Sequence, residues 1–364
     1  MRHVYLLIFV FFVLLFTAGI IYVARRTAFC FTLSQAATTT IFIFIFLSVI
    51  AALSSNSYVK GTSAVSHVLT LYCCYAAGFL LYLLLTTLFV HLCSIPLHIR
   101  PITQGIATYA ITICTFIFSI FSTSHIVTTH VTIPFPKISQ DIRIAHLSDV
   151  HLGHFRDGSW LSKIVERVNS EHPDVVVITG DLFESFYNLK SETLTPLTKL
   201  DAPVLFVTGN HDSYVNLARI KSMVQDAGVK ILDNETTNIK GIQFVGLAFN
   251  ANPDSTLTKM DIDRKLPTIL LYHYPKGLPV ANTIGVSLVL SGHTHAGQFF
   301  PLTLINHFAF QYNSGLHRYP EEGSTDRYTY IFTSDGVGTT GPPLRFGTFA
   351  QIPIITLQAT ASEE

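Results

Sequence analysis

The first third of the chain consists of long apolar stretches, whereas the rest alternates short apolar runs with polar loops. Four stretches are nearly free of charge and lie at 4–24, 37–53, 67–92 and 103–121. Each approaches the roughly 20 apolar residues that a helix needs to cross a bilayer. A signal peptide would also explain the first stretch, but no small-residue cleavage site precedes Arg25. We therefore predict a membrane domain, residues 1–123, with four transmembrane helices.

Charges beside these stretches favour one topology only weakly. Four spans place the N-terminus and the following domain on the same side, which then holds Arg2, Lys60, Lys137 and Arg143. The other side holds Arg25, Arg26 and Arg100. By the positive-inside rule, this small excess slightly favours a cytoplasmic domain in a multi-pass protein of the cell membrane. The centres of the spans contain no charged residue, which argues against a transporter or channel.

Composition limits the partners. The chain of 364 residues is 49% hydrophobic and 13% charged, with a formal net charge of zero. Since no basic cluster extends beyond Arg25 and Arg26, we expect no nucleic-acid partner. All five cysteines lie before residue 115, so no disulfide framework is expected in the domain that follows.

From residue 124 to 364 the pattern predicts a layered α/β domain. A leading strand is expected at 126–133, and helices are expected at 160–170 and 215–227. Apolar runs typical of buried strands lie at 142–147, 175–178, 204–207, 241–248, 266–272 and 287–290. Two further strands, 328–333 and 352–357, are predicted to close a second sheet.

Five of these strands end in polar side chains that suit metal binding. The first is followed by Asp149 and His151, whose two-residue spacing would place both on one side of an extended chain. The others are followed by Asp181, by Asn210 and His211, by His273, and by His293 and His295. Because open α/β sheets bind ligands at the carboxyl ends of their strands, we expect these residues to converge at one sheet edge.

The number and type of these side chains favour two metal ions. A single ion would use three or four protein ligands, whereas seven suit two ions that share a bridging carboxylate. Imidazoles mixed with carboxylates, without thiolate, favour Mn²⁺, Fe or Zn²⁺. Such a pair activates water for attack on phosphorus. Asn210 adds no charge that would repel a phosphate, and His211 is then available to protonate the leaving oxygen.

The ordered motifs Asp-x-His, Gly-Asp-x-x-Glu, Gly-Asn-His-Asp, a lone His and Gly-His-Thr-His resemble those of the calcineurin-like metallophosphoesterase superfamily. The resemblance covers residues 126–357 and implies a two-sheet β-sandwich flanked by helices. It also implies one metal ion held by Asp149, His151, Asp181 and His295. The other ion would be held by Asp181, Asn210, His273 and His293. Asp181 would then bridge the two ions, and His211 would act at the leaving group.

The segment 334–347 further resembles the membrane-attached bacterial phosphoesterases similar to YkuE and YaeI. Glu184 departs from the superfamily pattern, which usually has Asp at this position, a residue that often orients the catalytic His. The sequence alone does not establish whether Glu184 orients His211.

The sequence therefore predicts a membrane-anchored dimetal phosphohydrolase that cleaves a phosphate ester or pyrophosphate bond. A single span would be enough to tether the domain, so four spans favour a substrate at the bilayer, such as a lipid or a nucleotide-linked lipid. A soluble phosphorylated molecule is the other substrate class. The alternative is a catalytically silent sensor or scaffold that binds metal and ligand. His211 argues against it, because a binding module needs no leaving-group acid. The oligomeric state is left open.

Several other residues allow two interpretations. His146 is expected to pack within its strand, and His154 is a weaker candidate for the pocket lining. His317, Arg318 and Arg345 are expected at the surface, with contact to a phosphate or head group as the alternative because Arg binds phosphate bidentately. An aromatic cluster after the last motif is predicted to be core, although an exposed part would suit acyl chains or a bilayer interface. Its members are Phe299, Phe300, Phe308, Phe310 and Tyr312.

Overall fold

The structure is a computed structural model that describes residues 2–53, 60–135, 137–320 and 328–360, with side chains from residue 17 onward. The chain forms two compact units. The first contains nearly all described residues up to Phe121, and the second contains nearly all from Ser122 onward.

The first unit is built from long helices. Its described residues form α1 (Arg2–Phe31), α2 (Gln35–Leu53), α4 (Ala64–Leu97) and α5 (Pro101–Ser124), so each predicted apolar stretch is helical. Among the described residues, α4 and α5 are long and apolar enough to cross a membrane, and α2 contains a shorter apolar segment, Gln35–Ala51. Two of the four predicted spans therefore meet the length and composition that a membrane requires.

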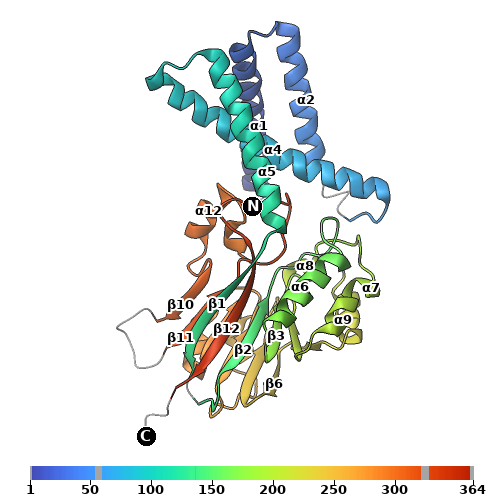
Figure 1. Ribbon diagram of the computed structural model, residues 1–364, viewed down its shortest axis with the longest axis vertical. Coiled ribbons are helices and arrows are strands. Elements are labelled where there is room, and N and C mark those ends of the chain that lie inside the picture. The colour runs from blue at the N-terminus through green and yellow to red at the C-terminus, as the bar shows by residue number, and fades with distance from the viewer. Residues whose placement is uncertain (1, 54–59, 136, 321–327, 361–364) are drawn as a thin grey trace. The chain divides into compact units, whose positions relative to one another are not determined.

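The second unit is a sandwich of two mixed sheets (Figure 1). In the part that the structure describes, the first sheet has the strand order β1-β12-β2-β3-β4-β5. Its strands are β1 (Ile126–Phe135), β2 (Ile142–Leu147), β3 (Val175–Thr179), β4 (Val204–Val207), β5 (Lys230–Ile231) and β12 (Ala350–Ala359).

The second sheet has the order β10-β11-β9-β8-β7-β6 over the same described ranges. Its strands are β6 (Glu235–Ile239), β7 (Ile242–Gly246), β8 (Thr268–Leu271), β9 (Leu288–Ser291), β10 (Gly315–Tyr319) and β11 (Thr329–Thr333). The helical elements of this unit include α7 (Ser191–Leu194), η1 (Thr195–Lys199), α8 (Asn210–Val215), α10 (Pro253–Leu257), η2 (His295–Gly297) and α12 (Leu302–Ala309).

Both faces of each sheet are covered, which explains the continuous apolar runs of the sequence. In β3, Val175 and Val177 pack between the sheets, while Val176 and Ile178 pack beneath helices α6 (Gly158–Ser170) and α9 (Leu217–Asp226). Helix α11 (Leu278–Ile284) covers the outer face of the second sheet. The expected α/β sandwich flanked by helices is thus confirmed.

One strand joins a different sheet from the one predicted. The run 352–357 belongs to β12, which lies between β1 and β2 in the first sheet, with Ile354 opposite Ala145. Its apolar pattern predicts a buried strand, but the choice of sheet depends on pairing with residues about 200 positions earlier in the chain. The edge strands β6 and β10 were not predicted, because partly exposed edges lack a continuous apolar run.

Candidate metal centre

The predicted metal ligands meet at one end of the sandwich, where strands of both sheets terminate. Asp149, Asp181 and Asn210 follow β2, β3 and β4 of the first sheet, whereas His273 and His293 follow β8 and β9 of the second. The expectation of a single sheet edge is therefore wrong, since the site needs the carboxyl ends of two packed sheets.

Most of these ligand residues have a left-handed backbone conformation, which sets the direction of their side chains. Among the proposed ligands, φ is 54° at Asp149, 52° at His151, 53° at Asp181, 73° at His293 and 51° at His295. Asp149 and His151 thus converge because the chain turns after β2, and not by the strand alternation that their spacing indicates. Non-glycine residues in this region are uncommon, and they concentrate at functional sites where the surroundings impose the strain.

The first group of ligands comprises Asp149, His151 and His295, whose ligand atoms lie within 4.8 Å of one another. His151 Nε2 lies 3.1 Å from His295 Nε2, and His295 Nε2 lies 3.3 Å from Asp149 Oδ1. All three residues are buried. This arrangement matches three of the four residues predicted for the first metal ion.

The second group comprises Asp181, His273 and His293, whose ligand atoms also lie within 4.8 Å of one another. His273 Nε2 lies 3.2 Å from Asp181 Oδ2, 3.0 Å from Asn210 Oδ1 and 3.2 Å from His293 Nδ1. Asp181 Oδ2 also lies 3.9 Å from His151 Nε2 of the first group. The Asp181 carboxylate therefore lies within 4 Å of a histidine of each group, and the structure brings all seven predicted side chains together.

The hydrogen bonds within these groups indicate that cations belong there. His273 Nδ1 lies 2.8 Å from the carbonyl oxygen of Thr179, so Nδ1–H donates, and Nε2 is the atom that can bind a metal ion once it has lost its proton. Nε2 faces the Asp181 and Asn210 oxygens, which are acceptors. His151 is fixed in the same way, because its Nδ1 lies 2.6 Å from Glu184 Oε2. Converging acceptors of this kind repel one another unless a cation lies between them, and imidazole with carboxylate suits divalent metal ions.

The pKa values reflect the same attraction for positive charge. Burial opposes protonation of His273, but the Asp181 carboxylate overcomes it and raises the pKa of His273 to about 9. Burial and the neighbouring His273 charge lower the pKa of His293 to about 4. Burial likewise opposes protonation of His151, yet Glu184 raises its pKa well above the usual value. The site therefore gathers positive charge around its carboxylates.

Glu184 contacts both a predicted ligand and the predicted catalytic residue. Its Oε2 lies 2.6 Å from His151 Nδ1 and 2.7 Å from His211 Nδ1, while Oε1 accepts a hydrogen bond of 2.9 Å from Thr340 Oγ1. The longer Glu side chain therefore reaches both rings from one carboxylate. Glu184 is thus placed where it can orient the His211 ring.

Asp212 is a supporting residue that sequence reasoning missed. Its carboxylate is fully buried and accepts hydrogen bonds of 2.9–3.1 Å from the backbone N–H groups of Asp181, Leu182, Phe183 and Gly209. These bonds tie the loop after β3 to the loop after β4. Burial and the nearby Asp181 charge raise the pKa of Asp212 to about 6. Its position directly after Gly-Asn-His was the available signal.

Arg345 is buried, so neither interpretation from the sequence holds for it. Its side chain is 0% exposed and donates to the carbonyl oxygens of Asp335, Gly336, Gly338 and Phe349. Burial lowers its pKa to about 10. These carbonyl groups include that of Gly338, whose N–H donates to Asp149 O at 2.7 Å. Arg345 thus holds the segment that contacts the loop after β2. Arg345 therefore shapes the backbone behind Asp149.

The other histidines and Arg318 have local contacts. His146 is buried and lies 2.8 Å from Thr179 Oγ1, and burial lowers its pKa to about 3. His154 stacks on Tyr187 at 4.7 Å between ring centroids. His317 Nε2 lies 2.9 Å from Ser314 O, and the Arg318 guanidinium lies 4.1 Å from the centroid of the Tyr328 ring.

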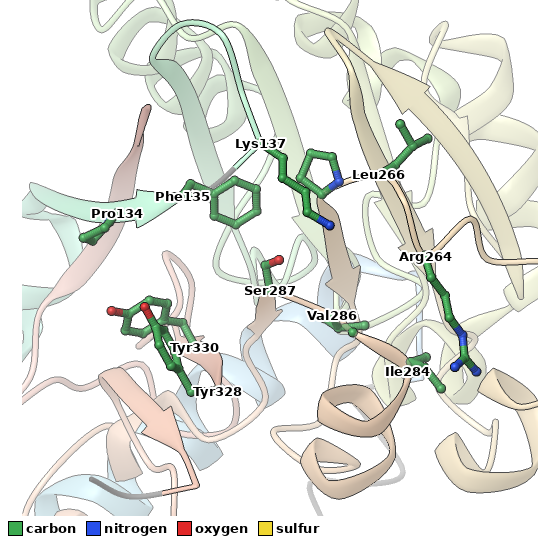
Figure 2. Close-up of a pocket in the computed structure, with 12 residues that line it drawn as sticks. Pro134, Phe135, Lys137, Arg264, Leu266, Ile284, Val286, Ser287, Tyr328 and Tyr330 are labelled. Carbon is green, nitrogen blue, oxygen red and sulfur yellow. The ribbon is translucent and has the colours of Figure 1, made fainter. Parts of the chain in front are cut away.

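A separate cavity of about 380 Å³ lies at the opposite end of the sandwich, beside the starts of β8 and β9 (Figure 2). Lys137, Ser287, Tyr328 and Tyr330 contribute polar groups to its lining. It contains none of the predicted metal ligands. The clustered ligands, rather than the shape of this cavity, therefore identify the candidate site.

Known proteins share this domain. Residues 142–297 match the calcineurin-like phosphoesterase family. An uncharacterized metallophosphoesterase of Helicobacter pylori strain J99 is 34% identical over 233 residues, which is 61% of each chain. A transmembrane protein with metallophosphoesterase domain from Danio rerio is 32% identical over 252 residues, 63% of this chain and 56% of that protein. The chain thus spans less than two thirds of these two relatives.

The uncharacterized metallophosphoesterase YkuE of Bacillus subtilis is 30% identical over 234 residues, which cover 60% of this chain and 79% of that protein. The family match contains every one of the converging side chains, from Asp149 to His295. On these grounds the chain belongs to the calcineurin-like metallophosphoesterase family.

Proposed function

We propose that this protein is a membrane-anchored, metal-dependent hydrolase that cleaves a phosphate ester or pyrophosphate bond. The observation that carries the proposal is the convergence of two ligand groups around the Asp181 carboxylate. Family membership supports the same class of reaction.

The side chains divide into two metal sites that share one carboxylate. Asp149, His151, Asp181 and His295 would hold one ion, whereas Asp181, Asn210, His273 and His293 would hold the other. Two divalent ions, with Mn²⁺, Fe or Zn²⁺ favoured by the ligands, would polarise the phosphoryl oxygens and lower the pKa of bound water. Asn210 limits the negative charge that an incoming phosphate meets.

His211 would supply the proton to the leaving oxygen. It is the second residue of α8, and its backbone N–H donates to Asp181 Oδ1 at 2.8 Å. With Nδ1 bound to Glu184, the ring directs Nε2 away from that carboxylate. A proton carried on Nε2 can then be donated to the leaving oxygen.

The membrane domain would anchor this activity at a bilayer. We place the boundary between residues 123 and 124, with α1, α2, α4 and α5 as four spans of a multi-pass cell-membrane protein. The lengths and composition of α4 and α5 support this topology, as does the relative named a transmembrane protein. The weak charge asymmetry favours a cytoplasmic catalytic domain. A phosphorylated lipid or nucleotide-linked lipid is the substrate class that such anchoring favours.

The test uses the full chain in detergent, loaded with Mn²⁺ and given bis(4-nitrophenyl) phosphate. Asp181→Ala should abolish hydrolysis and reduce the bound metal measured by elemental analysis, whereas the exposed control Asp261→Ala should leave both unchanged. Equal rates in wild type and Asp181→Ala would contradict the proposal. Metal-dependent ligand binding without product, across soluble and lipid phosphoesters, would favour the sensor or scaffold. A reporter fused at the C-terminus would determine the topology.

A further inference from the structure

Helix α12 (Leu302–Ala309) presents an apolar face to its surroundings. The exposed fractions of Leu304, Ile305 and Phe308 are 53%, 60% and 85%, and none of its residues is buried. The helix contains no charged side chain other than His307, which is charged only when protonated. A single exposed leucine is ordinary in a soluble domain, but a contiguous face of large apolar side chains marks an interaction surface.

The polarity of this helix is inverted relative to an ordinary surface helix. Its partly buried residues are Thr303 and Asn306, and Asn306 Nδ2 donates to Thr294 O at 2.7 Å and to Asn313 Oδ1 at 2.6 Å. At roughly 100° per residue, Leu304, Ile305 and Phe308 fall on one arc and the two polar residues fall outside it. The polar side therefore packs on the protein while the apolar side is left without a partner among the described residues.

Strand register places α12 at the end of the domain where the candidate span α5 enters. Ile126, two residues after α5 ends, pairs with Ala350 at the start of β12. Phe346, shortly before β12, accepts a hydrogen bond of 3.0 Å from the backbone N–H of Phe300, shortly before α12. The chain reaches at most about 7 Å over the two residues from the end of α5 to Ile126, and at most about 14 Å over the four from Phe346 to Ala350. The entry point of the chain and the start of α12 therefore lie close together.

The metal centre lies at this same end. Because β12 runs antiparallel to β2, the start of β12 is level with the end of β2, which Asp149 follows. The link to α12 is direct, since Thr294, whose carbonyl accepts from Asn306, separates the predicted ligands His293 and His295. The ring of His293 also lies 5.9 Å from that of Phe310, just after the helix.

We propose that α12 inserts its apolar face into the interface of the bilayer that holds the membrane helices, and so presents the metal centre to phosphoesters of lipids at that surface. This inference rests on the proposed membrane anchoring and narrows the substrate class of the proposed hydrolase. The entry point of the chain, α12 and the metal centre all lie at one end of the domain. This placement favours the bilayer, rather than a second copy of the chain, as the partner of the apolar face. Interfacial helices bury such a face about 5–10 Å deep at the level of the headgroups.

The test is tryptophan scanning in nanodiscs that each hold one chain. Trp160 is the sole tryptophan of the sequence and gives a constant background, because it is only 7% exposed. The variants Leu304→Trp, Ile305→Trp and Phe308→Trp test the apolar face, and His307→Trp tests the flank of the same helix. Lys259→Trp, at an exposed site on another loop, is the matched control. The lipid carries bromine on its acyl chains, which quenches tryptophan on contact.

We expect the three apolar-face variants to be quenched about twice as strongly as the His307 and Lys259 variants, because only their rings reach acyl-chain depth. Equal quenching at all positions would overturn the inference, as would a blue-shifted emission at Phe308→Trp that bromine leaves unquenched, since the face would then be covered by protein. Quenching needs no turnover, so an inactive enzyme does not affect the result. Extraction of the chain by alkaline carbonate would instead refute the anchoring itself, and with it this inference.

Discussion

Glu184→Gln removes one negative charge and changes little else, so it tests how much the metal centre depends on this carboxylate. One oxygen, Oε2, contacts His151 Nδ1 at 2.6 Å and His211 Nδ1 at 2.7 Å. Glutamine can still offer one carbonyl oxygen to both rings and turn its amide toward the Thr340 hydroxyl. The geometry is therefore retained while both hydrogen bonds lose their charge.

The expected loss follows from those two contacts. A hydrogen bond to a charged group contributes about 1.5–3 kcal/mol and a neutral one about 0.5–1.5 kcal/mol, so two bonds lose roughly 2–3 kcal/mol together. With 1.4 kcal/mol per factor of ten, this predicts a decrease of about 30- to 140-fold, divided between metal affinity and kcat/KM.

The assay measures kcat/KM for bis(4-nitrophenyl) phosphate at saturating Mn²⁺, together with a calorimetric metal titration. Glu166→Gln, on the exposed side of α6, is the matched control. Glu184→Asp keeps the charge but is shorter by one methylene, and the backbone of residue 184 is held by a 2.8 Å hydrogen bond to Leu152 O. We expect it to lose one ring contact and give an intermediate value. If Glu184→Gln changes both quantities by less than about threefold, the carboxylate does not support the site in this way.

Other perturbations test the surroundings of the ligands. Asp212→Asn places an amide nitrogen where two backbone N–H groups donate, so a thermal-denaturation series should show a loss of about 2–4 kcal/mol; an unchanged midpoint would contradict this role. Gly209→Ala would put Cβ 2.1 Å from Asp181 Oδ1, so bound metal should decrease, whereas Gly158→Ala, with no atom closer than 3.4 Å, should not change it. Because the pKa of His273 is raised to about 9, metal-free protein holds this proton at pH 7 and metal binding must release it. Metal affinity should therefore rise with pH up to about 9, and calorimetry in buffers of different ionisation enthalpy should detect the released proton; equal heats would exclude it.

The sequence by itself determined where the buried strands and the candidate ligands lie along the chain. A short, continuous apolar run such as 175–178 is typical of a strand that is covered on both faces. Polar residues that directly follow such a run therefore lie at the end of the strand. Asp149, Asp181, Asn210 and His273 can therefore be assigned from the amino-acid sequence, because their signal is local. The order of the motifs added the resemblance to the family, which implies the proposed division of the candidate ligands between two metal ions.

The tertiary structure alone decided which partners these local elements meet. The sheet that β12 joins, the four N–H groups that converge on Asp212 and the carbonyl oxygens around Arg345 all come from residues distant in the sequence or from irregular backbone. Which way the apolar face of α12 points was also decided only by the tertiary structure, because its apolar residues give the same helical pattern whether they face a core or a membrane. Periodicity fixes which residues share a face, whereas only packing fixes what that face meets.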